Sequence, residues 1–90
     1  MYFVVKSVSW IDKVHGKNVP MVSAIVEEAF TDIEDMRAYV KNGIDFLPEK
    51  NFDVSGDETI YGSHLPDVSI YDKKAKEWIR YYCQEKRVVV

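Results

Sequence analysis

The segment TDIEDMRAYVKNGIDFL, residues Thr31–Leu47, decides the fold, because it carries the strongest helix signal in the chain. Its apolar residues recur at steps of three and four, which places them in one stripe along a helix. The members of this stripe are Ile33, Met36, Val40, Ile44 and Leu47. The segment therefore predicts one amphipathic helix whose apolar stripe belongs to the core.

Both ends of this helix carry boundary signals. Thr31 and Glu34 have the S/T-x-x-E spacing of a capping box, in which each side chain binds the other residue's backbone N–H. Gly43 is expected to follow the last turn with a positive φ, and Pro48 prevents the helix from continuing. The predicted helix therefore spans Asp32–Asn42.

The N-terminal stretch Tyr2–Ile11, YFVVKSVSWI, is rich in β-branched and aromatic residues and predicts a strand. Its more apolar face, expected on the core, consists of Tyr2, Val4, Val8 and Trp10, interrupted by Lys6. Gly16 and Asn18 follow in the stretch DKVHGKN and are typical turn residues. These residues predict the tip of a β-hairpin.

The next segment, Val19–Phe30, fits two interpretations. Its alternating residues Val22, Ala24, Val26 and Phe30 match one face of a strand, with Glu28 as an exception. The same segment also fits a helical extension that would run into the helix described above. The hairpin turn directly before it and the separate helix start favour the strand.

The C-terminal segment Val68–Val90 also fits two interpretations. It matches a hairpin with a polar tip at residues 73–76, or a helix capped by Asp72. The hairpin is favoured because tryptophan, isoleucine and tyrosine in succession suit a sheet. Val88–Val90 is then expected to extend the last strand. The preceding stretch, Pro48–Asp67, shows no period and is expected to be a long loop with a short strand at Thr59–Tyr61.

The combined pattern predicts an α+β fold: a small antiparallel sheet of about four strands, in the order β-β-α-β-β, with one helix across one face. Ninety residues make a single domain, 1–90. The single cysteine, Cys83, excludes an intramolecular disulfide and favours a reducing, cytoplasmic location. The N-terminal stretch is too short and too polar for a signal peptide, and we expect no association with membranes.

The sequence contains no catalytic signature, so we expect a protein that is not an enzyme. Asp53, Ser55 and Asp57 have the spacing that opens an EF-hand loop. The sixth and twelfth positions of that loop hold Glu58 and His64, where calcium binding requires glycine and glutamate. We therefore expect neither a metal nor a cofactor.

Negative charge is concentrated in residues 27–58, which contain ten acidic and three basic residues. An acidic surface would attract a basic partner. The leading hypothesis is therefore a small protein-binding module, an inhibitor or adaptor, that docks on another protein with a basic surface, such as a nucleic-acid-binding protein. The candidate partner-binding residues are Glu27, Glu28, Glu34, Asp35, Glu49, Asp53, Asp57 and Glu58.

Two other hypotheses are retained. In a strand, Trp78, Arg80 and Tyr82 would share one face and could stack on a nucleotide or on single-stranded nucleic acid. The net charge of −3 disfavours general binding to nucleic acid. The third hypothesis is a structural subunit that forms a homodimer through an exposed strand such as Val88–Val90.

Overall fold

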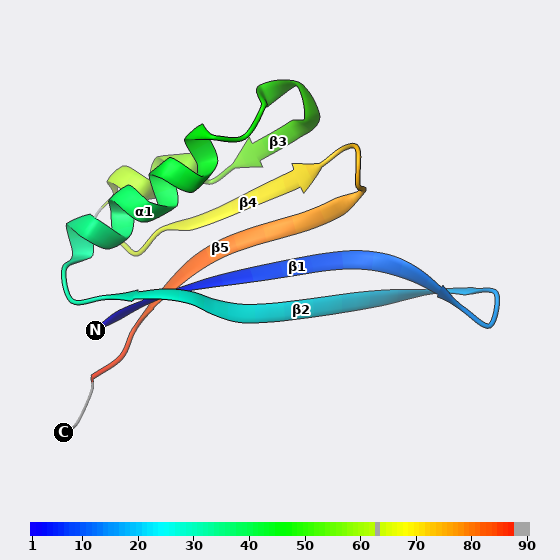
Figure 1. Cartoon of the computed structure of the whole chain (residues 1–90), viewed down its shortest axis with the longest axis horizontal. Helices are drawn as coiled ribbons and strands as arrows, with labels where there is room; N and C mark the ends of the chain where they lie inside the picture. Colours follow the sequence, from blue (N-terminus) through cyan, green and yellow to red (C-terminus); the bar gives the residue numbers. More distant parts are fainter. Residues whose placement is uncertain (63, 88–90) are drawn as a thin grey trace.

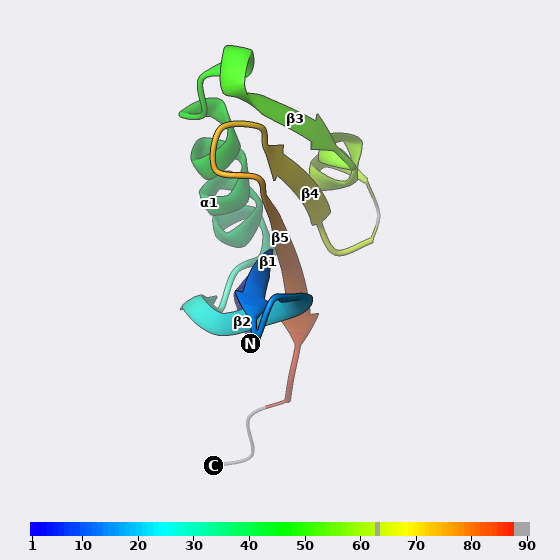
Figure 2. The ribbon, with the colours of Figure 1, turned by 90° about the vertical axis from the view of Figure 1, so that its right-hand side faces the viewer.

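The computed structural model describes residues 1–62 and 64–87 of the chain. Its elements are β1 (Tyr2–Val14), β2 (Lys17–Phe30), α1 (Ile33–Asp45), η1 (Glu49–Asn51), β3 (Phe52–Ser55), η2 (Asp57–Tyr61), β4 (Asp67–Asp72) and β5 (Glu77–Glu85). The strands form a five-stranded antiparallel sheet in the order β2-β1-β5-β4-β3 (Figure 1). α1 packs against one side of it (Figure 2), which confirms the predicted α+β class and adds one strand to the expected four.

The core lies between α1 and the sheet. Its buried residues are Val4, Met36, Val40, Ile60, Val68, Ile70 and Cys83. Met36 and Val40 come from the predicted apolar stripe, and Ile33, Ile44 and Leu47 pack around the same cluster. The stripe is therefore confirmed as core. In the described residues, no helix is long and apolar enough to cross a membrane.

Both predicted helix ends are wrong. The N-cap is Asp32, whose Oδ1 accepts hydrogen bonds from the backbone N–H groups of Glu34 at 2.7 Å and Asp35 at 3.4 Å. Aspartate caps a helix as well as threonine does, so the cap forms at Asp32 instead of the expected capping box at Thr31. Gly43 lies inside α1, which ends at Asp45 and has Phe46, with a φ of −80°, as its C-cap. Packing of the later stripe residues against the core extends the helix past the glycine.

The hairpin at residues 14–17 is confirmed. His15 and Gly16 have φ values of 53° and 75°, as a two-residue type I′ turn requires. β1 pairs with β5 only as far as Ser9 opposite Trp78. Beyond that pair the hairpin projects from the sheet as a two-stranded ribbon (Figure 1).

β2 confirms the strand interpretation of residues 19–30, but the prediction that Val22, Ala24, Val26 and Phe30 share one face is wrong. Val4 pairs with Glu28 whereas Val5 pairs with Val26, so Glu27 is the extra residue of a β-bulge. A one-residue shift reverses which side chains face the core. Phe30 therefore packs on the core, while Val22 and Val26 are 67% and 60% exposed.

The stretch 48–67, which the sequence predicts as a loop, contains more secondary structure than expected. It contains η1, β3 and η2, so the proposed strand at Thr59–Tyr61 is a 3-10 helix instead, and the additional strand is Phe52–Ser55. Arg37 of α1 secures this stretch through hydrogen bonds from Nη1 to the Ile60 carbonyl at 2.8 Å and from Nη2 to the His64 carbonyl at 3.3 Å. Each contact joins residues that are more than twenty positions apart in the sequence, so local sequence patterns do not predict it.

The C-terminal hairpin is confirmed by β4 and β5, with the tip at residues 73–76. Asp72 does act as a cap, because its Oδ1 accepts from the N–H groups of Lys74 and Ala75, both at 3.0 Å. It caps a turn, however, and no helix follows in the described residues. The predicted extension through Val88–Val90 lies outside the described residues.

Candidate binding face

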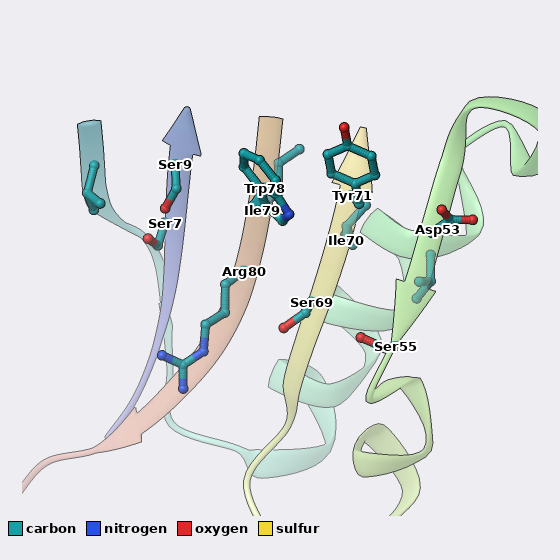
Figure 3. A pocket seen from close by; sticks show the side chains of 12 residues that line it. Ser7, Ser9, Asp53, Ser55, Ser69, Ile70, Tyr71, Trp78, Ile79 and Arg80 are labelled. Carbon is teal, nitrogen blue, oxygen red and sulfur yellow. The ribbon is translucent and has the colours of Figure 1, made fainter. Parts of the chain in front are cut away.

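The side of the sheet opposite α1, which we call the open face, is covered by no described element (Figures 2 and 3). Residues directly paired in an antiparallel sheet point to the same side. Two rows of paired residues therefore cross β1, β5, β4 and β3. They are Ser7, Arg80, Ser69 and Ser55, and next to them Ser9, Trp78, Tyr71 and Asp53. These side chains line a shallow hollow of about 470 Å³ (Figure 3).

Trp78 is the dominant side chain of the open face. It is 48% exposed although it lies on β5, the central strand of the sheet. Its ring lies beside that of Tyr71 on β4, with centroids 5.0 Å apart and an angle of 36° between the planes. A tryptophan supported by a neighbouring ring on a regular strand is a rigid apolar platform.

Arg80 lies next to this platform with its charge compensated. Its Nε and Nη2 donate to Oδ1 and Oδ2 of Asp67 at 2.8 and 2.6 Å. Its guanidinium also lies 4.6 Å from the ring centroid of Tyr82. The hydrogen bonds from Arg80 lower the pKa of the Asp67 carboxyl, although partial burial opposes the shift. The guanidinium is thus held between Asp67 and Tyr82, and its positive charge is paired.

The rest of the hollow is mixed: Val22, Val54, Ile70 and Ile79 line it together with serines, and its charged side chains are paired. Serine hydroxyls line its β1, β4 and β3 parts, and the Asp53 carboxylate forms an ion pair with Lys73 at 3.2 Å. No histidine or cysteine is present among the described lining residues. This arrangement suits binding through apolar contact and hydrogen bonds.

Strand alternation predicts that Trp78, Arg80 and Tyr82 share a face, and the structure places them together on the open face. The sequence did not predict that Tyr71 and the serines share this face, because they come from other strands whose register is not encoded locally. The alternation of Ser7 and Ser9 in β1 was the available signal for a polar face. Whether these residues bind a ligand stays a prediction.

The acidic candidates do not form one group. Glu34 and Asp35 lie in the first turn of α1, which is about 20 Å long, whereas Glu49 begins η1 after the helix has ended. Asp57 and Glu58 lie in η2, and Asp53 lies on the open face. Glu27 and Glu28 lie at the β2 bulge.

Several of these carboxylates already have partners within the fold. Glu27 Oε2 accepts a hydrogen bond from Tyr39 Oη at 3.1 Å, and Glu34 lies 3.7 Å from Arg37. Burial, and then the hydrogen bond to Glu27, raises the pKa of Tyr39. In the described part of the chain, no group of three histidine, cysteine or acidic residues could hold a metal ion.

Comparisons with protein-family models, with curated proteins and with solved structures found no match to this chain. Its function is therefore inferred from the chemistry of its own surfaces.

Proposed function

We propose that this protein is a non-enzymatic protein-binding module whose binding surface is the open face around Trp78. The observation that carries the proposal is the half-exposed Trp78 on a central strand, beside Tyr71, Arg80 and Tyr82. Tryptophan, tyrosine and arginine are the residue types that most often dominate the energy of protein interfaces. On this face they lie together on neighbouring strands.

The charges of the open face favour a protein segment over a phosphate backbone. Arg80 is paired with Asp67, and Lys73 is paired with Asp53. Binding to nucleic acid requires lysine and arginine side chains that are free to neutralise phosphates. The whole chain, moreover, carries a net charge of −3. The serines can instead bond to the peptide groups of a partner, while Trp78 provides the apolar anchor.

The acidic residues have a separate role in this proposal. Glu28, Glu34 and Asp35 lie at the end of the molecule where β2 passes into α1. Exposed charges at the rim of an interface mainly raise the association rate, and salt weakens their effect. A basic partner would thus be steered by these acids and held by the open face.

Substitution of Trp78 tests the proposal. The partner is first captured from the native source with the wild-type chain and purified, and its affinity for variants is then measured by calorimetry. Trp78→Ala should weaken binding at least tenfold, because truncation of a central aromatic anchor costs about 2 kcal/mol or more. The matched control is Phe46→Ala, since Phe46 is 87% exposed but lies at the end of α1. Equal affinities for Trp78→Ala and wild type would refute the proposal.

A second candidate function is the binding of a ring-shaped ligand such as a nucleotide. The hollow of about 470 Å³ has the size of a small-molecule site, about 300–1,000 Å³. Trp10→Phe leaves Trp78 as the single tryptophan, so fluorescence then reports on the hollow alone. Saturable quenching by nucleosides or a short single-stranded oligonucleotide would favour this function, and a flat titration would exclude it.

A further inference from the structure

The outer edge of β2 is a long strand edge with no neighbour among the described residues. Its segment Val19–Val26 carries no charged residue. Val22, Ile25 and Val26 are exposed there at 67%, 58% and 60%. Proteins usually protect such edges with charges or a covering element, and an uncharged apolar edge pairs readily with another strand.

The hydrogen-bond pattern shows which groups of β2 point outward. Met1 and Lys86 exchange two backbone hydrogen bonds, from the Lys86 N–H to the Met1 carbonyl at 2.9 Å and from the Met1 amino group to the Lys86 carbonyl at 3.1 Å. Bonded and non-bonded pairs alternate along antiparallel strands, so odd-numbered β1 residues bond to β5 and even-numbered ones bond to β2. The even-numbered residue Val14, which closes the type I′ turn with Lys17, agrees with this assignment.

In β2, Ser23 and Ile25 pair with the even-numbered β1 residues Val8 and Lys6 and therefore bond inward. The residues between and beside them, Val22, Ala24 and Val26, direct their N–H and C=O groups away from the sheet. They can bond to a new strand without loss of any existing bond in the sheet.

The outward-facing segment is nearly symmetric in sequence. Residues 22–26 are VSAIV, so that Val22 and Val26 are equidistant from Ala24. If a second copy pairs antiparallel about Ala24, Val22 lies opposite Val26 of that copy on the open face, and Ser23 lies opposite Ile25 on the other side. The outward groups of these residues would then form about six interchain hydrogen bonds. A self-complementary strand is what a two-fold dimer requires.

Features at both ends limit this pairing to one register. Pro20 is the next outward-facing position, and it has no N–H to donate. At the other end the bulge at Glu27 interrupts the strand directly after Val26. The six residues between these two features, 21–26, are the part of the edge that can pair.

Charge complementarity favours the second copy over another partner. The hairpin tip is basic, with Lys13 and Lys17, whereas the far end of β2 leads into the acidic start of α1. Antiparallel pairing about Ala24 directs the hairpin tip of each copy toward the side where β2 of the other copy leads into α1. At both ends of the interface, a basic tip and an acidic helix start therefore lie on the same side.

We infer that β2 binds β2 of a second copy in antiparallel orientation about Ala24, which joins two five-stranded sheets into one. A two-fold axis perpendicular to the sheet keeps both α1 helices on one side and both open faces on the other. This inference does not depend on the proposed function, because Trp78 lies on β5 and not on the β2 edge.

Sedimentation velocity over a range of concentrations tests the dimer. The wild-type chain should sediment with twice its mass of 10.5 kDa. Val26→Lys and Ala24→Pro should give monomers with unchanged circular dichroism, because one places a charge on the edge and the other removes an outward N–H. Ile11→Lys is the matched control, since Ile11 is 53% exposed on β1, away from the edge, and should remain dimeric. Trp78→Ala should also remain dimeric.

A cysteine cross-link tests the register. Ala24 lies opposite its own copy at about 5.5 Å between Cα atoms, a distance that a disulfide can span. Ala24→Cys should therefore oxidise to a covalent dimer, while Val22→Cys should not, because the two Val22 positions are about 13 Å apart along the strands. Both variants carry Cys83→Ala so that the new thiol is the only one. A monomeric wild type at high concentration, dimeric edge variants, or equal cross-linking at both positions would each overturn the inference.

Discussion

Arg80 of β5 binds Asp67 of β4 diagonally across the sheet, because its direct neighbour on β4 is Ser69. Both Asp67 oxygens accept hydrogen bonds from the guanidinium, at 2.8 and 2.6 Å. The pair fixes the guanidinium against Tyr82 and leaves the half-exposed Trp78 as the largest apolar side chain of the open face. The orientation of the Arg80 guanidinium thus depends on residues of both β4 and β5.

The first prediction concerns the titration of Asp67. Its pKa is lowered chiefly by the hydrogen bonds from Arg80, so Arg80→Gln should raise it toward the ordinary value of 3.8. Because the folded-state pKa lies below the unfolded one, the stabilisation is present above the unfolded pKa and is lost as the pH falls through the folded pKa. Both side chains are about half exposed, so the contribution should stay below about 1 kcal/mol. NMR titration of the carboxyl carbon measures the shift, and an unchanged pKa in Arg80→Gln would contradict it.

Two glycines should respond to alanine in opposite directions. Gly56 has a φ of 79°, and a Cβ there would lie 2.5 Å from the Asp67 carbonyl oxygen. Gly56→Ala should therefore lower the free energy of unfolding by about 1–3 kcal/mol. Gly43 lies inside α1, where an added Cβ would meet no neighbouring group within 4 Å, so Gly43→Ala should raise it by about 0.5–1 kcal/mol. Urea unfolding measures both values, and destabilisation by Gly43→Ala would show that this position is not an ordinary helix interior.

Arg37 should control the order of the segment around η2. Its side chain is only 12% exposed, and it donates to the Ile60 and His64 carbonyls. Arg37→Ala should destabilise the fold by about 1–3 kcal/mol, because it leaves carbonyl groups without their partner. Hydrogen exchange should increase most in residues 57–62. Lys41→Ala, on an exposed part of the same helix, is the control and should leave this exchange unchanged.

These contacts also explain what the sequence could predict. The helical period identified Met36 and Val40 as core, and strand alternation placed Trp78 beside Arg80, because both patterns are local. The β2 bulge was not predictable, since Glu27 bonds to Tyr39 twelve positions later. The order of residues 48–67 likewise depends on a side chain from α1. The sequence therefore predicts the helix and the hairpins but not the contacts that join them.

The last prediction concerns Cys83, which lies in the core at 8% exposure. Burial raises the pKa of its thiol from 9.0 to about 11. The Cys83 thiol therefore ionises at a lower pH in the unfolded chain than in the folded chain. As the pH rises, this ionisation stabilises the unfolded state relative to the folded state. The free energy of unfolding should fall as the pH rises from about 9 to about 11. Below pH 9 this thiol should add no pH dependence.

Urea unfolding at a series of pH values measures this loss, and Cys83→Ala is the reference, because it lacks the thiol but keeps every lysine and tyrosine. The difference in unfolding free energy between wild type and Cys83→Ala should shrink across this pH range. The folded thiol should also react slowly with a disulfide reagent at pH 8 and rapidly in denaturant, since the reactive form is the thiolate. Rapid reaction in the folded state, or a difference that stays constant with pH, would mean that the thiol is accessible to solvent.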